Sequence, residues 1–265
     1  YYDGILKIED IPNDIPFTKN ASFQIKHHKS QQTYIDKIAI KEFIKSVKYP
    51  INFFDFETFQ NSIPRFKYQK PFEQIPFQYS LHILHEDGTI IHKEFLGDEF
   101  SDPRVELIFQ MVEDITKSGT IMAFNQSFEK TQIKNLANYF KKLVEHSNFR
   151  FEGKLNMSDE LLRLLDRFID LAYPFQSKAY YHPNFHGGYS IKTILPVLFP
   201  EDKELDYKNL NIQHGGIAME SFSNLYLIDD KSKREKIKND LLEYCKLDTW
   251  AMVKIWEFLN KAIEK

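Results

Sequence analysis

The hydrophobic pattern of the chain combines short apolar runs with longer segments of helical periodicity, which predicts an α/β fold. The first strong apolar run covers residues 52–58 and predicts a strand. Two more apolar runs, at residues 77–84 and 89–96, flank Asp87-Gly88, and Asp-Gly is typical of tight hairpins. The sequence therefore predicts three antiparallel strands that begin with residues 52–58.

Apolar positions in most of the remaining chain recur at helical spacing. A short run at residues 120–124 predicts a fourth strand beside the first, and Gly119 is expected to cap the helix before it. Ser127 is expected to cap the helix that follows this strand, and Ser190 the helix that begins beside it. Helices are predicted over residues 36–47, 102–117, 127–143, 159–168, 190–198, 217–227 and 232–263.

The pattern also predicts how the chain is divided. Residues 1–47 are interpreted as a lead-in, because prolines and polar residues interrupt any regular period, and residues 48–265 as one domain. Within that domain, residues 173–190 are rich in Tyr, His, Pro and Gly and predict a shaped loop. Since the sequence starts at Tyr1 rather than Met, we expect it to be a piece of a longer protein.

Composition narrows the function classes without selecting one. Hydrophobic residues make up 42% and charged residues 28% of 265 residues, as in an ordinary globular protein. The net charge of −3 does not indicate a polyanion partner, although a local basic groove is compatible with it. The single cysteine, Cys245, excludes an intrachain disulfide and a Cys-rich zinc site. With no long apolar stretch and no leader pattern, we expect a cytoplasmic protein with no membrane partner.

Two carboxylates follow each other on the first predicted strand. Because strand side chains alternate, Asp55 and Glu57 share one face while Phe54 and Phe56 point to the other. Two neighbouring carboxylates repel unless a cation neutralises them or one keeps a proton. Such oxygen ligands suit Mg²⁺ or Mn²⁺. The alternative for an isolated Asp-x-Glu is an acidic strand end turned towards water.

Two further motifs carry polar groups at helix positions. Tyr244 and Asp248 lie four residues apart on the last predicted helix and therefore share a face. For the pair taken alone, a tyrosine packed with its hydroxyl at the rim is the simpler explanation. Asn125, Phe128 and Glu129 open the helix that follows the fourth strand.

The order of these motifs resembles the DEDD superfamily of 3'-to-5' exonucleases in its tyrosine subclass, DEDDy. These enzymes have a ribonuclease-H-like (DnaQ-like exonuclease) fold, with a mixed sheet flanked by helices. The resemblance covers about residues 48–262. The whole pattern most resembles the bacterial DUF2779 family, whose members often follow a RecB-type or Cas4-like nuclease domain. This resemblance implies such a domain as an N-terminal partner in the full-length protein.

The resemblance also implies two-metal hydrolysis of phosphodiester bonds at a single-stranded end of DNA or RNA. Asp55, Glu57 and Asp248 would hold one Mg²⁺ or Mn²⁺, and Asp55 with Glu129 would help to place the second. Tyr244 would orient the attacking water, because a phenol with a pKa of about 10 is a poor base at neutral pH. The residues implied to bind substrate are Thr58, Asn125, Phe128, Ser190 and Lys192.

One departure from the superfamily pattern keeps alternatives open. Most relatives have Asp where this chain has Glu129, and the added methylene moves the carboxylate by about an ångström or more. One alternative is a catalytically weak or inactive module that binds nucleic acid or a partner nuclease domain. Another is a phosphodiesterase acting on short oligonucleotides. The loop at residues 65–72 mixes cations with aromatic rings, as single-strand-binding surfaces do. A shared cluster requires Asp55, Glu57 and Asp248 to lie within about 8 Å of one another.

Overall fold

The computed structural model describes residues 4–12, 14–146 and 156–264 of the chain. These residues form two compact units. The small unit comprises the described parts of Tyr1–Ser46, Ala172–Asp202 and Glu257–Lys265, and the sheet unit comprises those of Val47–Leu171 and Lys203–Trp256. The predicted division into residues 1–47 and 48–265 stays a prediction about folding domains.

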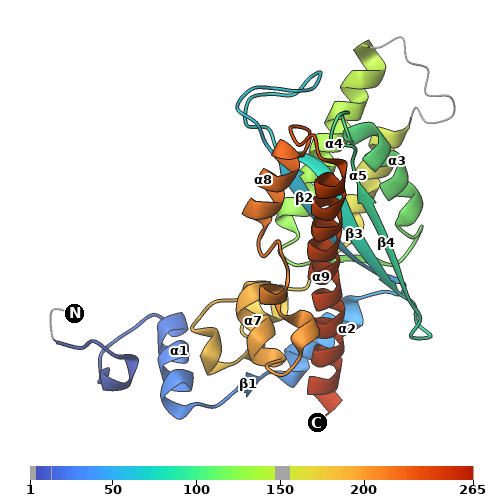
Figure 1. The fold of residues 1–265 in the computed structure, drawn as a ribbon. Helices are drawn as coiled ribbons and strands as arrows, with labels where there is room; N and C mark the ends of the chain where they lie inside the picture. Colours follow the sequence, from blue (N-terminus) through green and yellow to red (C-terminus); the bar gives the residue numbers. More distant parts are fainter. Residues whose placement is uncertain (1–3, 13, 147–155, 265) are drawn as a thin grey trace. The chain divides into compact units, whose positions relative to one another are not determined.

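Five strands form one mixed sheet in the sheet unit, in the order β4-β3-β2-β5-β6. Figure 1 labels β2, β3 and β4 of this sheet. β2 and β3 pair antiparallel, as do β3 and β4, whereas β5 is parallel to β2 and β6 is parallel to β5. The three predicted antiparallel strands and the fourth strand beside the first are confirmed. The sequence does not predict β6, because three residues are too few to show a period. The strands are β2 (Ile51–Phe59), β3 (Ile75–Leu84), β4 (Ile90–Leu96), β5 (Thr120–Ala123) and β6 (Phe168–Asp170).

All the predicted helices are present, with ends that differ by a few residues. Ser127 does not cap its helix but is the first residue of it, and its hydroxyl donates to Asn125 Oδ1 at 3.3 Å. None of the described helices combines the length and the apolar character needed to cross a membrane. The helices at the predicted places are α2 (Lys37–Ser46), α3 (Arg104–Asp114), α4 (Ser127–His146), α5 (Met157–Leu164), α7 (Ile191–Leu198), α8 (Gly215–Leu225) and α9 (Lys231–Glu264).

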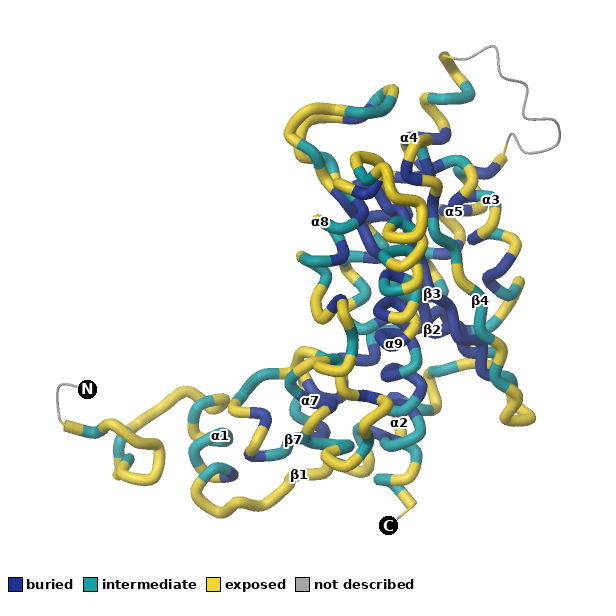
Figure 2. Tube along the Cα trace, viewed as in Figure 1, coloured by how far each residue is buried: buried dark blue, intermediate teal, exposed yellow. Residues whose placement is uncertain are grey.

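The two faces of strand β2 are covered by different helices, which makes the unit an α/β fold with helices on both sides of the sheet. Phe54 and Phe56 pack in one apolar cluster with residues of α3, α4 and α5. Phe59, at the end of β2, packs in a second apolar cluster with residues of α8 and α9. Figure 2 shows β2 and β3 as largely buried. The predicted alternation of Phe54 and Phe56 on one face with Asp55 and Glu57 on the other is therefore confirmed.

The small unit contains more regular structure than the sequence predicts. Helix α1 (Lys19–Ser30) lies within the predicted lead-in, and Thr18 caps it by accepting a hydrogen bond from the backbone N–H of Ala21. The predicted loop at residues 173–190 includes a short helix and a strand. The confirmed cap at Ser190 accepts a hydrogen bond from the Thr193 N–H at 3.2 Å. These further elements are α6 (Tyr173–Gln176) and β7 (Tyr180–Tyr181), which pairs antiparallel with β1 (Tyr34–Ile35).

Gly119 serves a different purpose from the predicted helix cap. Helix α3 ends at Asp114, several residues earlier. Gly119 has a left-handed backbone (φ +85°), and a Cβ there would lie 2.1 Å from the Pro50 carbonyl oxygen. The glycine thus allows the segments that lead into β2 and β5 to approach closely. The Thr120 N–H donates to the Lys48 carbonyl at 2.9 Å within this approach.

This close approach predicts that Gly119→Ala destabilises the sheet unit far more than a matched glycine substitution. Gly88 has a similar φ of +87°, but nothing lies within 4 Å of the Cβ that Gly88→Ala would add. We expect Gly88→Ala to lower the free energy of unfolding by about 1 kcal/mol. Gly119→Ala should cost at least about 2 kcal/mol more, because backbone must move. Urea unfolding followed by circular dichroism measures both, and equal losses would contradict the close-approach role.

Candidate metal centre

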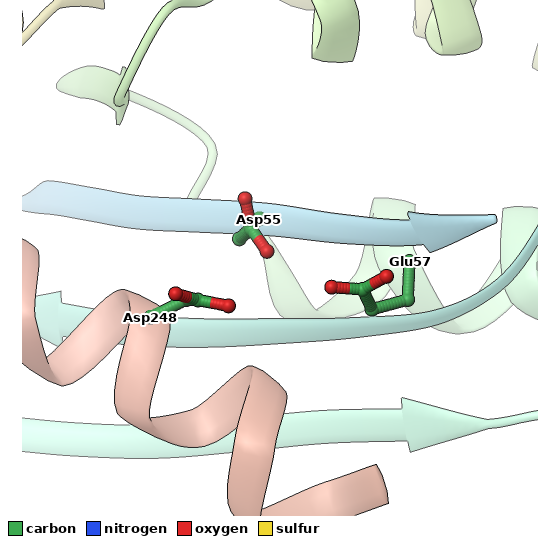
Figure 3. A group of neighbouring side chains, drawn as sticks. All are labelled: Asp55, Glu57 and Asp248. Atoms are coloured by element: carbon green, nitrogen blue, oxygen red, sulfur yellow. The ribbon is translucent and has the colours of Figure 1, made fainter. Parts of the chain in front are cut away.

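Strand β2 and helix α9 bring three carboxylates together (Figure 3). Asp55 and Glu57 come from the strand and Asp248 from the helix, and one ligand oxygen from each lies within 4.8 Å of the others. This separation is well inside the limit of about 8 Å that a shared cluster requires. Since coordination distances of about 2.1 Å let one ion join oxygens about 4 Å apart, small side-chain movements are enough to form a common cation site.

Helix α9 is fixed to the sheet on both sides of Asp248. The Gln78 side-chain amide donates to the Leu241 carbonyl at 2.8 Å. Further along the helix, the hydroxyls of Thr249 and Ser80 lie 2.7 Å apart and share a hydrogen bond. Both strand residues belong to β3, the neighbour of β2. These polar contacts set the rotation of α9 and so direct Asp248 towards β2.

The N-terminal end of helix α8 lies beside Glu57. A Cβ added to Gly215, the first residue of that helix, would be 3.6 Å from Glu57 Oε2. The pairing of β2 with β3 also shifts register between Glu57 and Thr58, a bulge that locally re-aims the strand. Because the N-terminal end of a helix carries partial positive charge, α8 contributes an attractive electrostatic field at the Glu57 carboxylate.

Two tyrosines accompany the carboxylates. Tyr244 is buried on α9, and burial, together with the charges of Asp248, Glu57 and Asp55, raises the pKa of its phenol, which therefore stays protonated at neutral pH. Tyr207 donates its hydroxyl hydrogen to Asp248 Oδ1 at 2.5 Å. The sequence does not single out Tyr207, because it lies in an irregular segment, and only the folded chain brings it to the helix.

Glu129 is the buried acid of the middle motif. It lies in the first turn of α4, is 3% exposed, and its Oε2 has no hydrogen-bond partner among the described residues. Burial, with the charge of Asp170 adding to it, raises the pKa of Glu129 to about 8. Burial and the charges of Asp248, Glu129 and Glu57 raise the pKa of Asp55 well above its usual range, so Glu129 is close enough to Asp55 to repel it.

Asp170 is a further acid near Glu129, and the sequence does not predict its role. It ends β6, and its carboxylate accepts hydrogen bonds from the backbone N–H groups of Asn125 at 2.9 Å and Gln126 at 3.2 Å. Asp170 therefore holds the turn that places Glu129. Its position at the carboxyl end of a strand parallel to β5 is the signal that could have found it, but β6 is too short to be recognised from sequence.

The donor set fits a hard divalent cation such as Mg²⁺ or Mn²⁺. Burying several carboxylates together is costly unless protons or cations neutralise them. Glu129 is not one of the three carboxylates that lie within 4.8 Å of one another, but its charge acts on Asp55 and its Oε2 has no hydrogen-bond partner among the described residues. Asp55, Glu57 and Asp248 would therefore hold one ion. A second ion, placed by Asp55 with Glu129, stays a prediction.

The predicted substrate residues of the sheet unit lie in three different settings. Thr58 is buried next to Glu57 on β2. Asn125 is exposed in a left-handed backbone conformation (φ 71°) just before α4. Phe128 packs against the apolar cluster between the sheet and α3, α4 and α5. Asn125 is thus the accessible residue of these three.

The other predicted contacts are spread over both units. Ser190 and Lys192 belong to the small unit, where Ser190 caps α7, and their contact with substrate stays a prediction. In the loop at residues 65–72, the Arg65 guanidinium donates to the Glu99 carbonyl at 2.8 Å and lies 3.9 Å from the ring centre of Tyr226. Arg65 therefore has structural partners within the sheet unit.

Comparison with known proteins adds a family and two relatives. The family described as "Domain of unknown function (DUF2779)" matches residues 52–190, which is more than half of the chain. The chain is 24% identical to the uncharacterized protein MG366 of Mycoplasma genitalium over 94% of its length, and 24% identical to the uncharacterized protein UU173 of Ureaplasma parvum over 90%. It spans only 38% and 35% of these relatives. No solved structure matches the chain.

Removing a ligand carboxylate should abolish or strongly weaken cation binding. We expect titration calorimetry to show Mn²⁺ binding to the native chain, and Asp55→Asn and Asp248→Asn to weaken it by at least about tenfold, since even losing an outer partner of a metal ligand costs this much. Asp240→Asn is the matched control, because Asp240 lies about two turns earlier on α9 and pairs with Lys236. Unchanged affinity in Asp55→Asn, or an equal loss in Asp240→Asn, would exclude this centre.

The raised pKa values predict that Mn²⁺ binding strengthens as pH rises. Glu129, with a pKa of about 8, must lose its proton to bind a cation, so affinity should increase from about pH 6 and level off above about pH 8. In the metal-free chain, the stability of the fold should instead decrease as pH rises. The folded state keeps a proton that the unfolded chain releases near pH 4.5, and the stability this provides is lost as pH rises through 8.

Both pH effects can be measured with one variant as a reference. Calorimetry in buffers of different ionisation enthalpy reports the protons released on Mn²⁺ binding, and urea unfolding without metal reports stability. Glu129→Gln should lose the part of both dependences that Glu129 contributes, while the part that comes from the raised pKa of Asp55 remains. An Mn²⁺ affinity that is constant between about pH 6 and 8 would contradict proton displacement by the cation.

Proposed function

We propose that this chain, which belongs to the DUF2779 family, is a metal-dependent 3'-to-5' exonuclease that hydrolyses phosphodiester bonds of single-stranded DNA or RNA. The observation that carries this proposal is the cluster of Asp55, Glu57 and Asp248, with Tyr244 one helical turn from Asp248. Oxygen-ligated divalent cations are a recurrent means of hydrolysing phosphodiesters.

We further propose that the sheet unit has the ribonuclease-H-like fold. Three antiparallel strands followed by two parallel ones, in the order β4-β3-β2-β5-β6, support this assignment. The paired acids on the central strand β2 and the third acid on a C-terminal helix support it as well. The motif order along the chain is the one expected for the tyrosine subclass of these exonucleases.

In this mechanism each side chain of the centre has a distinct task. Two bound cations would supply Lewis-acid stabilisation of the attacking and leaving oxygens. Asp55, Glu57 and Asp248 would hold the first ion, and Asp55 with Glu129 would help to place the second. Tyr244 keeps its proton at neutral pH and orients the attacking water by a hydrogen bond. Without cations, the acids repel the phosphates of the strand, so the substrate binds productively only to the metal-loaded protein.

The proposal extends to the strand and to a partner domain. Asn125, the accessible one of the predicted sheet-unit residues, is proposed to contact the strand, whereas contacts by Thr58, Phe128, Ser190 and Lys192 stay predictions. The family resemblance supports a RecB- or Cas4-like nuclease domain as a proposed partner, and the chain spans only 38% and 35% of the two relatives named above. A cytoplasmic location is proposed with the buried free thiol of Cys245 as its support.

A second candidate function is a nucleic-acid-binding module with weak or no catalysis. The observation that favours it is Glu129, whose carboxyl group has a pKa of about 8 and therefore holds a proton over much of the neutral range. A protonated Glu129 would not place a second ion, and the centre would then bind one cation without efficient hydrolysis.

The deciding experiment is cleavage of 5'-labelled single-stranded DNA and RNA with Mn²⁺ or Mg²⁺. We expect a ladder that shortens from the 3' end, with a rate at least about a hundredfold lower in Asp55→Asn and Asp248→Asn, because each removes charge that stabilises the transition state. Asp240→Asn should cleave like the native chain. Mn²⁺ binding without cleavage of either polymer would reject the exonuclease and favour the binding module.

A further inference from the structure

We propose that Tyr207 is a positioning residue of the metal centre, which holds the Asp248 carboxylate in the orientation that a divalent cation needs. The inference rests on the proposed cation centre and adds a residue outside all three motifs. The main support for this role is the hydrogen bond that the Tyr207 hydroxyl donates to Asp248 Oδ1, at 2.5 Å.

The segment around Tyr207 is built into the sheet unit. Tyr207 begins a short 3₁₀ turn, η5 (Tyr207–Asn209), which Asp206 caps by accepting a hydrogen bond from the Lys208 N–H at 3.0 Å. Leu205 is buried, and both Tyr207 and Leu210 pack against the apolar cluster that includes residues of α8 and α9. The phenol is therefore delivered to Asp248 by packed residues on both sides of it.

The chemistry of the contact suits a metal ligand. A carboxylate has two oxygens, and a donor bound to one of them restrains rotation of the group while the other remains available to a cation. A phenol, with an ordinary pKa of about 10, is a neutral donor at pH 7. A lysine or arginine in the same place would instead compete with the cation by neutralising Asp248.

Tyr207 and Tyr244 therefore have separable roles. Tyr244 lies one turn from Asp248 on the same helix, and the ring centres of the two tyrosines are 6.1 Å apart. Tyr207 bonds directly to a proposed ligand and should determine cation affinity. Tyr244, as the residue proposed to orient water, should determine turnover once the cations are bound.

The experiment compares Tyr207→Phe, Tyr244→Phe and Tyr226→Phe, each made in the whole chain. Tyr226→Phe is the matched control, because Tyr226 is a partly exposed tyrosine that stacks with Arg65. Mn²⁺ affinity is measured by titration calorimetry. Stability is measured by urea unfolding without metal, and kcat and KM are measured on the labelled strand at low and saturating Mn²⁺.

We expect Tyr207→Phe to weaken Mn²⁺ binding by about tenfold, the lower end of what losing an outer partner of a metal ligand costs. Tyr226→Phe should keep native affinity. The kcat deficit of Tyr207→Phe should disappear at saturating Mn²⁺ without a change in KM for the strand, whereas that of Tyr244→Phe should persist.

The outcomes separate this inference from the exonuclease proposal. Native Mn²⁺ affinity in Tyr207→Phe, with or without a loss of stability, would reduce the hydrogen bond to a structural contact and overturn the inference. Weakened Mn²⁺ binding in Tyr207→Phe alone would support it even if no strand is cleaved, and only the exonuclease would then be rejected. Absence of Mn²⁺ binding by the native chain would overturn both proposals.

Discussion

Electrostatic repulsion between acids enclosed by β2, α4 and α9 is the constraint on which the candidate site depends. Asp55, Glu57 and Asp248 place oxygens within 4.8 Å of one another, and the charge of Glu129 also acts on Asp55. Burial raises the pKa of Asp55 and Glu129, so part of this charge is neutralised by protons when no cation is bound. The acids thus have two ways to remain buried, and the proposed activity requires the change from protons to cations.

The scaffold holds this arrangement because β2 is buried on both faces. On one side, Phe54 and Phe56 are enclosed by apolar residues of the surrounding helices, and removing such surface from water provides about 25 cal/mol per Å². On the other side, α9 is tied to β3 through Gln78 and Ser80. The apolar face stabilises the fold, and the polar contacts set the orientation of α9. The acids are therefore held close together by the scaffold rather than by attraction for one another.

The sequence predicts the parts of the site that follow from a local period. Asp55 and Glu57 share a face because strands alternate, and Tyr244 and Asp248 share one because they lie four apart on a helix. Tyr207 and Asp170 escape prediction because their approach depends on long-range packing of short, irregular segments. Gly119 is misjudged for the same reason, since the backbone that its missing side chain admits lies far away in the sequence.

Glu129 stands at the position where the chain departs from the exonuclease pattern, which has Asp there. Its helix begins at a turn that Asp170 holds, so the longer side chain starts from a fixed backbone. Its Oε2 is buried without a partner among the described residues, and a buried acceptor without a partner is costly. A proton on Glu129 lowers this cost, and a cation shared with Asp55 would remove it. The added methylene is therefore compatible with a second ion, and the proton on Glu129 becomes the barrier that this ion must displace.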